Sequence, residues 1–420
     1  MKTKPNNKTK LSSFDLFLDV NMPHIDHCIE QFRKEIGLRQ KTQIRALKLL
    51  LCNLYKKQDI EIMVPRSKTA LAIKKFNPLE VGYRPFIGAL DALDKYGWIE
   101  QVIGITGEKM TTIKTTPKLL QWFDDAGWSN ETIEVKARQY ITLRENQKLG
   151  GRSVYIDYEE TEYSRWLQDE LEKYNKLLNK SQIVLRGVNG KEDKVFDKLS
   201  IPRRFIRHKN IVVKNGEFMF GGRMSGPWTN LSSENRKRIH INGEPTIDLD
   251  REASHLNAMY QVVTGAPYSG IKPYKVEING LVIPRHIVKK FSSFMQNGKT
   301  PGGTANSVIR AYKKESDSTE YEEYLEIRKK FTPTEIVNAI LEKHPMIAPY
   351  YLKGKAYGDY ISCWESDIVF EVVVELTRRG IPCLTIYDSF IVPLKYKELV
   401  DEMKDKTPYV NRRRLDKVAL

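Results

Sequence analysis

Two short segments of the sequence read as β-strands that carry a carboxylate at one end, and they constrain the fold more than any other feature. The segment TIDLD alternates two apolar residues with Asp248 and Asp250, the pattern of a half-buried strand with one acidic face. The segment TIYDSFIVP places Asp388 between two apolar stretches. Because a buried carboxylate is costly unless a positive group meets it, Asp388 either reverses a hairpin or belongs to a charged site. If the two strands are neighbours in one sheet, Asp250 and Asp388 converge.

Converging carboxylates of this kind predict a metal site. Two ionised carboxylates a few ångströms apart repel each other unless a divalent cation lies between them. Hard oxygen ligands select Mg²⁺, which often completes its coordination shell with substrate phosphates. A site with two such ions stabilises the attacking and leaving oxygens of an in-line phosphoryl transfer. We therefore predict that Asp250 and Asp388 bind two Mg²⁺ ions, with Mn²⁺ as a possible substitute, and we interpret Asp248 as a strand-surface residue.

A third segment, IPRHIVKKFSSFMQNG, predicts a basic helix. Pro284 suits the first turn of a helix. At 3.6 residues per turn, Arg285, Lys289, Ser292 and Gln296 fall within about 60° of one another. The two cations lie about 6 Å apart along the helix axis, a spacing that matches a triphosphate, for which guanidinium and ammonium groups are suitable partners. A solvated basic face is the alternative.

The charge of the whole chain favours a polyanionic partner. The sequence contains 69 Lys and Arg residues against 53 Asp and Glu residues, a formal net charge of +16. Such a surplus favours nucleic acid before a membrane surface. A basic surface without a binding function is the alternative.

Cysteine usage and hydropathy indicate the compartment. The four cysteines show no spacing typical of a zinc site or a disulfide framework, which fits a reducing compartment. No apolar run approaches the ~20 residues of a membrane-spanning helix, and the first residues lack the apolar region of a signal peptide. We expect a soluble protein without membrane partners, located in the cytoplasm of a bacterium or of a phage-infected host.

The first third of the chain resembles a winged helix, a common duplex-binding module. From about residue 41, apolar periodicity predicts one helix, then a second over roughly 78–96, then a hairpin. In that scheme the second helix enters the major groove, while the hairpin lies near phosphates. A small helical domain with a hairpin and no groove contact is the alternative. The residues expected to contact DNA are Tyr83, Arg84, Lys95 and Lys114.

The order of the later segments resembles family A DNA polymerases and their relatives, the single-subunit phage-type RNA polymerases. The family carries a Gly-Arg-x-Ser and Asn-Leu segment that grips the primer–template near the active site. This chain has Gly222, Arg223, Ser225, Asn230 and Leu231 at that spacing. By the same charge argument, Arg236 is expected to meet phosphates.

The catalytic motifs of the family follow in order. Asp250 corresponds to the first metal-binding aspartate of the palm, and Arg285 and Lys289 match the first half of the fingers-helix pattern. Asp388 lies in a Tyr-Asp-Ser triplet where the DNA enzymes have His-Asp-Glu and the RNA enzymes His-Asp-Ser.

The chain departs from the family pattern at three places. The family DNA polymerases have a glutamate five residues after the first aspartate that helps to exclude the ribose 2′-hydroxyl, and here that position is His255. The fingers helix of the family carries an aromatic residue that stacks on the incoming base. The corresponding position here is Ser293, and the aromatic Phe294 comes one residue later. Ser389 agrees with the RNA enzymes. The sequence therefore does not identify the sugar-selecting residue.

The resemblance implies an α+β fold with a right-hand polymerase palm and fingers core and a winged-helix-like domain before it. We expect a partly disordered segment over 1–40 and the winged-helix-like domain over 41–130. A helical connector or reduced thumb over 131–215 precedes the palm and fingers over 216–420.

The resemblance also implies an activity. It predicts a template-dependent nucleotidyltransferase, a compact DNA-directed DNA polymerase without proofreading that joins nucleoside triphosphates to a primer 3′-hydroxyl with two Mg²⁺ ions. The expected catalytic residues are Asp250, Asp388, Arg285 and Lys289; the expected nucleotide-binding residues add Phe294, Gln296 and His255. Those expected on the primer–template are Arg223, Ser225, Asn230 and Arg236.

Two alternatives stay open. One is an RNA-synthesising enzyme, a primase or single-subunit RNA polymerase, which Ser389 and His255 favour. The other is a non-catalytic replication-initiation or regulatory protein of a phage, plasmid or other mobile element that binds DNA.

Overall fold

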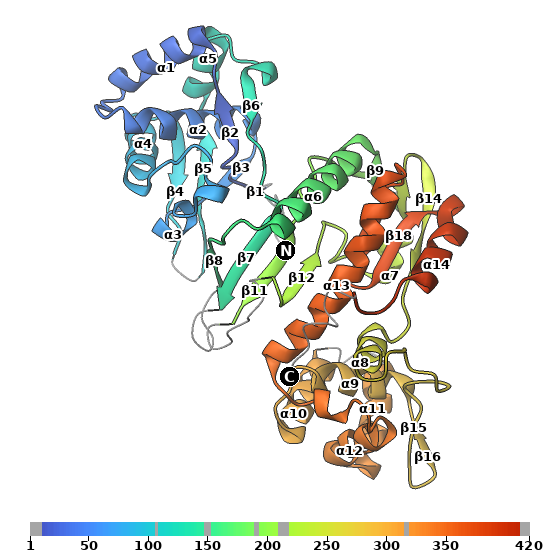
Figure 1. Ribbon diagram of the computed structural model, residues 1–420. Helices are drawn as coiled ribbons and strands as arrows, with labels where there is room; N and C mark the ends of the chain where they lie inside the picture. The colour runs from blue at the N-terminus through green and yellow to red at the C-terminus, as the bar shows by residue number, and fades with distance from the viewer. Residues whose placement is uncertain are drawn as a thin grey trace, which may run out of the picture. The chain divides into compact units, whose positions relative to one another are not determined.

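The chain forms two compact units of mixed α and β structure, which confirms the α+β class (Figure 1). The first unit comprises Met1–Gln139 with Val154–Asp157, and the second comprises Tyr140–Ser153 with Tyr158–Leu420. The computed structural model describes residues 11–105, 108–146, 153–188, 193–208, 218–314 and 319–411. None of the helices in these ranges combines the length and the apolarity needed to cross a membrane.

The first unit is built on a four-stranded sheet in the order β1-β3-β5-β4. Strand β1 pairs with β3 in parallel, and the other pairs are antiparallel. The strands are β1 (Leu11–Ser13), β3 (Glu61–Val64), β4 (Ile99–Val102) and β5 (Thr111–Thr115), and a second pair is formed by β2 (Leu18–Val20) and β6 (Ile133–Val135). The helices are α1 (Pro23–Glu35), α2 (Thr42–Lys56), α3 (Lys68–Leu71), α4 (Tyr83–Lys95) and α5 (Pro117–Asp125).

The helices predicted in this unit form where apolar periodicity indicates them. Leu47, Leu51 and Leu54 of α2 are fully buried, as predicted, but so is every other residue from Leu49 to Leu54, so the second half of the helix is buried on all sides. Helix α4 begins at Tyr83 rather than near residue 78, because Pro85 fits the first turn, where its missing N–H needs no partner. Strands β4 and β5 form the predicted hairpin.

The segment before residue 41 is more ordered than its sequence predicts. Within the described residues it forms β1, β2 and α1, and the side chains of Leu18, Ile25 and Phe32 are buried in the core of the first unit. Residues 1–10 of the segment expected to be partly disordered lie outside the described residues.

The second unit contains a six-stranded antiparallel sheet in the order β10-β9-β13-β14-β18-β17. Its strands are β9 (Ile183–Leu185), β10 (Lys194–Phe196), β13 (Ile239–Ile241), β14 (Glu244–Leu249), β17 (Leu384–Ile386) and β18 (Ser389–Pro393). The segment 131–215, expected as a helical connector or reduced thumb, therefore supplies two strands of this sheet.

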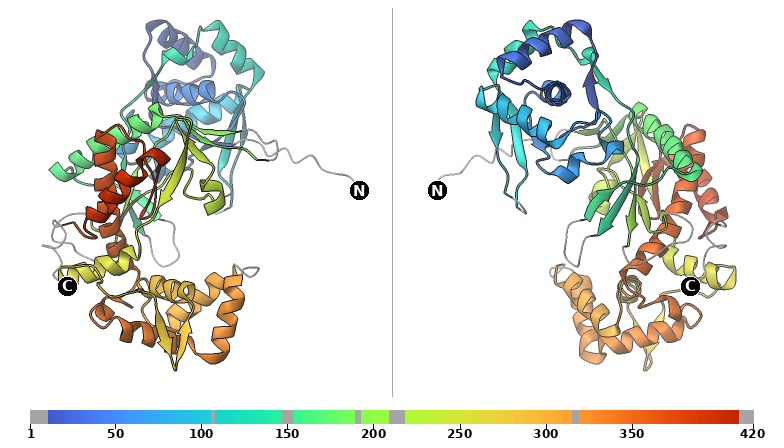
Figure 2. Two further views of the ribbon diagram at one scale, coloured as in Figure 1. Left: turned by 90° about the vertical axis from the view of Figure 1, so that its right-hand side faces the viewer. Right: turned by 60° about the vertical axis from the view of Figure 1, so that its left-hand side comes forward.

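Two long helices accompany the sheet and lie side by side in the views of Figures 1 and 2: α6 (Glu162–Lys180) and α13 (Lys355–Arg378). Thr161 and Ser164 form a capping box that starts α6. Tyr174 of α6 donates a hydrogen bond to the carbonyl oxygen of Cys383, directly before β17, over 2.8 Å.

A second group of strands packs against α13. Strand β11 (Arg203–Arg207) pairs with β12 (Gly221–Met224) and with β7 (Ile141–Asn146). The buried Arg203 donates to Asp367 of α13 over 2.8 Å. The remaining helices of the second unit are α7 (Ser233–Arg236) and α14 (Lys397–Lys406). Strand β8 (Ser153–Ile156) crosses the boundary between the units, with Ser153 in the second and the rest in the first.

A helical layer is inserted between β14 and α13. Its elements are α8 (Ser254–Thr264), the hairpin β15 (Val276–Ile278) and β16 (Leu281–Ile283), α9 (Arg285–Met295), α10 (Pro301–Lys313), α11 (Thr319–Lys330) and α12 (Pro333–Lys343). These elements share one hydrophobic cluster, to which the first half of α13 contributes Ile361 and Trp364. Helix α13 therefore joins the helical layer to the sheet.

Candidate active site

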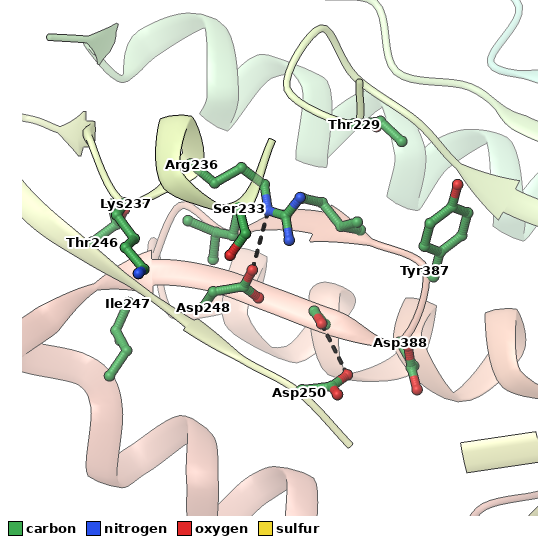
Figure 3. Close-up of a pocket in the computed structure, with 13 residues that line it drawn as sticks. Thr229, Ser233, Arg236, Lys237, Thr246, Ile247, Asp248, Asp250, Tyr387 and Asp388 are labelled. Carbon is green, nitrogen blue, oxygen red and sulfur yellow. Dashed lines mark hydrogen bonds and ion pairs between the residues drawn. The ribbon is translucent and has the colours of Figure 1, made fainter. Parts of the chain in front are cut away.

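The two carboxylate-bearing strands are neighbours. Strands β14 and β18 pair antiparallel, with Leu249 opposite Phe390. Asp250 follows Leu249, and its Oδ1 accepts a hydrogen bond from Ser389 Oγ over 3.0 Å. Asp388 lies in the two-residue turn between β17 and β18. The sheet therefore brings Asp250 and Asp388 to the same edge (Figure 3), and Asp388 fulfils both readings, as a turn residue and as part of a charged site.

The turn is held in a demanding conformation. Tyr387 has φ +54°, a left-handed backbone that is unfavourable for a residue with a Cβ. A two-residue hairpin of this kind needs positive φ at its first central position. The conformation presents Tyr387 on the surface, 53% exposed, and sends the next side chain toward the end of β14.

The electrostatics of the pair suit a cation. Burial raises the pKa of Asp388 to about 7, and the carboxylates of Glu365 and Asp250 contribute in the same direction. Within the described parts of the chain, no cation forms an ion pair with Asp388. A divalent ion at the two carboxylates would relieve their repulsion. The described residues hold no group of three or more His, Cys, Asp or Glu placed to bind a metal, so the rest of its coordination shell would come from water and phosphate, as Mg²⁺ commonly accepts.

A pocket of about 590 Å³ opens over the two strands (Figure 3). Asp250 and Asp388 line one part of it, and Arg236 and Lys237 of the α7 region line another. Arg236 Nε donates to Asp248 Oδ2 over 3.2 Å. The carboxylate interpreted as a strand-surface group therefore orients a cation in the pocket, and Arg236 lies where a phosphate could reach it.

A buried ionic network lies behind the pair and was missed from the sequence. Arg223 donates to Glu365 Oε1 over 2.6 Å, and His255 Nε2 lies 2.8 Å from Glu365 Oε2. Burial opposes the ionisation of Glu365, but His255 and Arg223 together lower its pKa to about 2. Burial likewise opposes the charge of His255, while Glu365 raises the pKa of the imidazole above its ordinary value. The guanidinium of Arg223 also lies 4.9 Å from the ring centroid of Tyr387.

The glycine before Arg223 has a steric reason. Gly222 has φ +80°, and a Cβ there would lie 2.7 Å from Ser366 Oγ. This close approach lets β12 lie against α13 and directs Arg223 toward Glu365. Ser366 lies within α13, and its hydroxyl is within hydrogen-bond distance of the carbonyl oxygens of Gly221 and Cys363.

The basic helix α9 presents part of its predicted stripe to solvent. Arg285 and Lys289 are exposed, and Arg285 pairs with Glu252 over 3.2 Å. The guanidinium of Arg285 lies 5.3 Å from the ring centroid of Tyr274. Burial raises the pKa of Tyr274 to about 12; Arg285 acts against this, while Asp388 and Asp250 add to it. Tyr274 therefore lies within electrostatic reach of the basic helix and of both aspartates.

The second half of the stripe turns inward, which corrects the prediction. Ser292 is buried and hydrogen-bonded to the hydroxyl of Tyr351 over 2.8 Å. Gln296 is 4% exposed and its Oε1 is bound by His255 Nδ1. Phe294 is half-buried against the hydrophobic cluster, and Ser293 is exposed. The helical layer packs on this end of α9, so Gln296 supports His255 instead of facing a nucleotide.

The predicted strand-contacting residues Ser225 and Asn230 line a neighbouring pocket of about 400 Å³. Thr229 borders both pockets. The residue before Thr229, Trp228, is fully buried and donates from Nε1 to the carbonyl oxygen of Thr385 over 3.0 Å. This anchor fixes the loop to the strand that leads to Asp388.

The expected DNA contacts of the first unit are mostly exposed. Arg84, Lys95 and Lys114 are exposed, whereas Tyr83 is half-buried, with its hydroxyl 3.4 Å from the carbonyl oxygen of Arg66. The exposed side of α4 also carries acidic residues, so its charge is mixed. The residues concerned are Asp91 and Asp94.

The sequence held a partial signal for the missed network. Glu365 and Asp367 interrupt an otherwise apolar stretch of a long helix, and both are buried. Two acids within a buried helix indicate cationic partners. Those partners, Arg223 and Arg203, lie more than a hundred residues earlier in the chain, so the sequence alone did not identify them.

The fold and the site together define an α+β protein with two carboxylates at the edge of an antiparallel sheet and a basic helix in the helical layer that follows β14. No protein-family model and no curated protein matches the sequence.

Proposed function

We propose that this protein is a template-dependent nucleotidyltransferase, most specifically a compact DNA-directed DNA polymerase without proofreading. The observation that carries the proposal is the meeting of Asp250 and Asp388 on neighbouring antiparallel strands. In this proposal the six-stranded sheet is the palm, and the helical layer with α9 forms the fingers.

Different side chains have different roles in the proposed nucleotide addition. Asp250 and Asp388 would hold two Mg²⁺ ions, which supply charge stabilisation for phosphoryl transfer when bound. Arg285 and Lys289 bind the triphosphate and neutralise the charge that develops on it. The primer 3′-hydroxyl gives up its proton to water as its oxygen forms a bond to the α-phosphorus. The bond from the α-phosphorus to the oxygen that bridges to the β-phosphate breaks, and pyrophosphate leaves with that oxygen. Tyr274 orients Arg285 by stacking beneath it.

The basic wall of the pocket suits a nucleic-acid strand. Arg236 is held by Asp248 beside the carboxylate pair, and guanidinium groups bind phosphates in a defined geometry. Ser225 and Asn230 line the adjoining pocket. We assign these groups to the primer–template backbone.

The first unit is proposed to be a winged-helix domain that binds duplex DNA. Its elements follow the order α2, β3, α3, α4, β4, β5, and β5 lies between β3 and β4 in the sheet. The positive side chains Arg84 and Lys95 of α4 and Lys114 of β5 are available to phosphates.

An RNA-synthesising enzyme is the second candidate. Two observations favour it: Ser389 binds Asp250 at the position where the DNA enzymes have a third acid, and His255 is engaged by Glu365. A non-catalytic DNA-binding protein is the candidate from another class. It is favoured by the winged-helix-like order of helices and hairpin in the first unit.

One assay separates the three candidates. Extension of a labelled primer is measured with deoxyribonucleotides and, in parallel, with ribonucleotides, with and without Mg²⁺. We expect Mg²⁺-dependent extension with deoxyribonucleotides that is lost in Asp250→Ala and Asp388→Ala and kept in Glu398→Ala, an exposed acid of α14. Preference for ribonucleotides supports the second candidate, and tight duplex binding without extension supports the third. Incorporation by Asp388→Ala at the wild-type rate refutes the proposal.

A further inference from the structure

The turn that carries Asp250 extends beyond the sheet. Leu249 is the last residue of β14 with a partner in β18, and α8 begins only at Ser254. Ala253, which precedes α8, has φ +50°, a left-handed backbone that a residue with a Cβ adopts under constraint. The sheet holds the Asp250 carboxylate through the hydrogen bond from Ser389 of β18, but strand pairing does not fix the backbone of Asp250 and the residues after it.

A later part of the chain holds this turn from outside. Lys404 Nζ donates to the backbone oxygen of Asp250 over 3.1 Å. Arg251, 5% exposed, donates over 2.8 Å to the carbonyl oxygen of Thr407 and over 3.3 Å to that of the following proline. Its guanidinium lies 4.1 Å from the ring centroid of Tyr409. Hydrogen bonds with this later segment therefore hold both the backbone of the turn, at Asp250, and one of its side chains, that of Arg251.

The same part of the chain is anchored at its other end. The side-chain oxygen of Gln261, on α8, accepts the backbone N–H groups of Tyr409 over 2.6 Å and of Val410 over 3.2 Å. Val410 is fully buried in the hydrophobic cluster of the helical layer. Asn411 is hydrogen-bonded to Glu371 of α13. The contacts join the turn, α8 and α13.

We infer that residues 404–411, here called the strap segment, position the Asp250 carboxylate for metal binding, and that Arg251 is a positioning residue for this site. The inference rests on the metal-binding role of Asp250 in the proposed function. The planar guanidinium of Arg251 fixes its donors in a rigid fork, so it transmits the position of the strap segment to the adjacent aspartate. A turn that needed only to be closed could use an apolar side chain at lower desolvation cost.

The direction in which the affinity for a divalent cation changes on replacing Arg251 shows whether Arg251 acts by positioning Asp250 or only by its charge. Replacing Arg251 by an uncharged residue removes a cation near two carboxylates, and by charge alone this strengthens binding of a divalent cation. Loss of positioning weakens it. The replacement Tyr409→Leu leaves the formal charge unchanged and removes the ring and the hydroxyl that contact the Arg251 guanidinium, so it reports on the position of Arg251 without removing its cation.

The test measures Mn²⁺ binding to the full chain by the electron paramagnetic resonance signal of free Mn²⁺, together with primer extension. We expect Arg251→Met and Tyr409→Leu to raise the Mn²⁺ dissociation constant about tenfold and to lower kcat about 10- to 100-fold, because a misplacement of about 1 Å has effects of this size. The KM for the nucleotide stays within about twofold of wild type, since Arg285 and Lys289 are untouched. Arg251→Lys recovers part of the loss.

Lys404→Ala and Lys397→Ala form the matched pair. Both lysines lie on α14 and pair with Asp401, but Lys404 belongs to the strap segment and contacts the turn, whereas Lys397 lies outside the segment. Lys404→Ala is expected to weaken Mn²⁺ binding and Lys397→Ala to leave it unchanged. The lysine pair also keeps the inference testable if Arg251→Met fails to fold, as thermal unfolding would show.

The outcomes separate this inference from the proposed function. Unchanged Mn²⁺ binding in Tyr409→Leu and Lys404→Ala, or tighter binding in Arg251→Met, overturns the inference even if the wild type extends primers. A wild type that binds Mn²⁺ through Asp250, loses it in these variants and extends no primer supports the strap segment and refutes the polymerase proposal.

Discussion

Replacement of Glu365 by glutamine should reveal how much the buried network behind the carboxylate pair contributes to stability. The Glu365 side chain is 4% exposed and is held by Arg223 and His255. Its pKa is about 2, against an ordinary value of 4.5. At about 1.4 kcal/mol for each pH unit, this difference corresponds to about 3 kcal/mol of folding free energy.

The sign of the pH dependence follows from the direction of the shift. A carboxyl group whose pKa is lowered by folding stabilises the folded state fully above the ordinary value of 4.5. The contribution disappears as the pH falls through 4.5 toward about 2. The wild type should therefore exceed Glu365→Gln by about 3 kcal/mol at pH 7, and the gap should narrow as the pH falls below 4.5.

The assay is equilibrium urea unfolding at several pH values, followed by circular dichroism. The control is Glu375→Gln, the same substitution on the same helix, where the carboxylate is 41% exposed and paired with Arg379. A surface pair of this kind contributes at most about 0.5 kcal/mol. The reasoning is refuted if Glu365→Gln behaves like this control, or if the difference from wild type stays constant between pH 6 and pH 3.

Three further outcomes follow from the structure. As the pH is raised toward the Asp388 pKa of about 7, the affinity for Mn²⁺ should increase about tenfold per pH unit, and above that pKa it should level off, because the proton and the metal compete for the carboxylate. A Mn²⁺ affinity that does not change between pH 5.5 and 8 contradicts this. Gly222→Ala should destabilise the protein by about 1–3 kcal/mol in urea unfolding, since the added Cβ would clash with Ser366 and φ is positive. The control is Gly302→Ala, where the added Cβ has open space. Equal urea midpoints for the two variants would contradict the steric argument. Arg84→Ala should weaken duplex binding at low salt and reduce by about 1 the slope of the logarithm of the binding constant against the logarithm of the salt concentration. Lys176→Ala of α6 is the control. A slope that Arg84→Ala leaves unchanged would exclude a phosphate contact by Arg84.

Local pattern was sufficient to predict the elements that carry the candidate site. The alternation in TIDLD and the apolar flanks of Asp388 encode β14 and the β17–β18 hairpin, because the side-chain period of a strand is visible over a few residues. The periodicity of Leu47, Leu51 and Leu54 predicted α2 in the same way. The convergence of Asp250 and Asp388 needed one further assumption, that the strands are neighbours, and the structure confirms it.

What packs against a helix cannot be read from the helix itself. Arg285, Lys289, Ser292 and Gln296 share one face by geometry, yet the helical layer covers the last two and leaves the first two exposed. The pairing of Glu365 with Arg223 and His255, and of Arg251 with the strap segment, joins residues separated by more than a hundred positions. Short-range periodicity contains no information about such contacts. They exist because each buried charge must find a partner of opposite charge or a hydrogen-bond acceptor once the chain has folded.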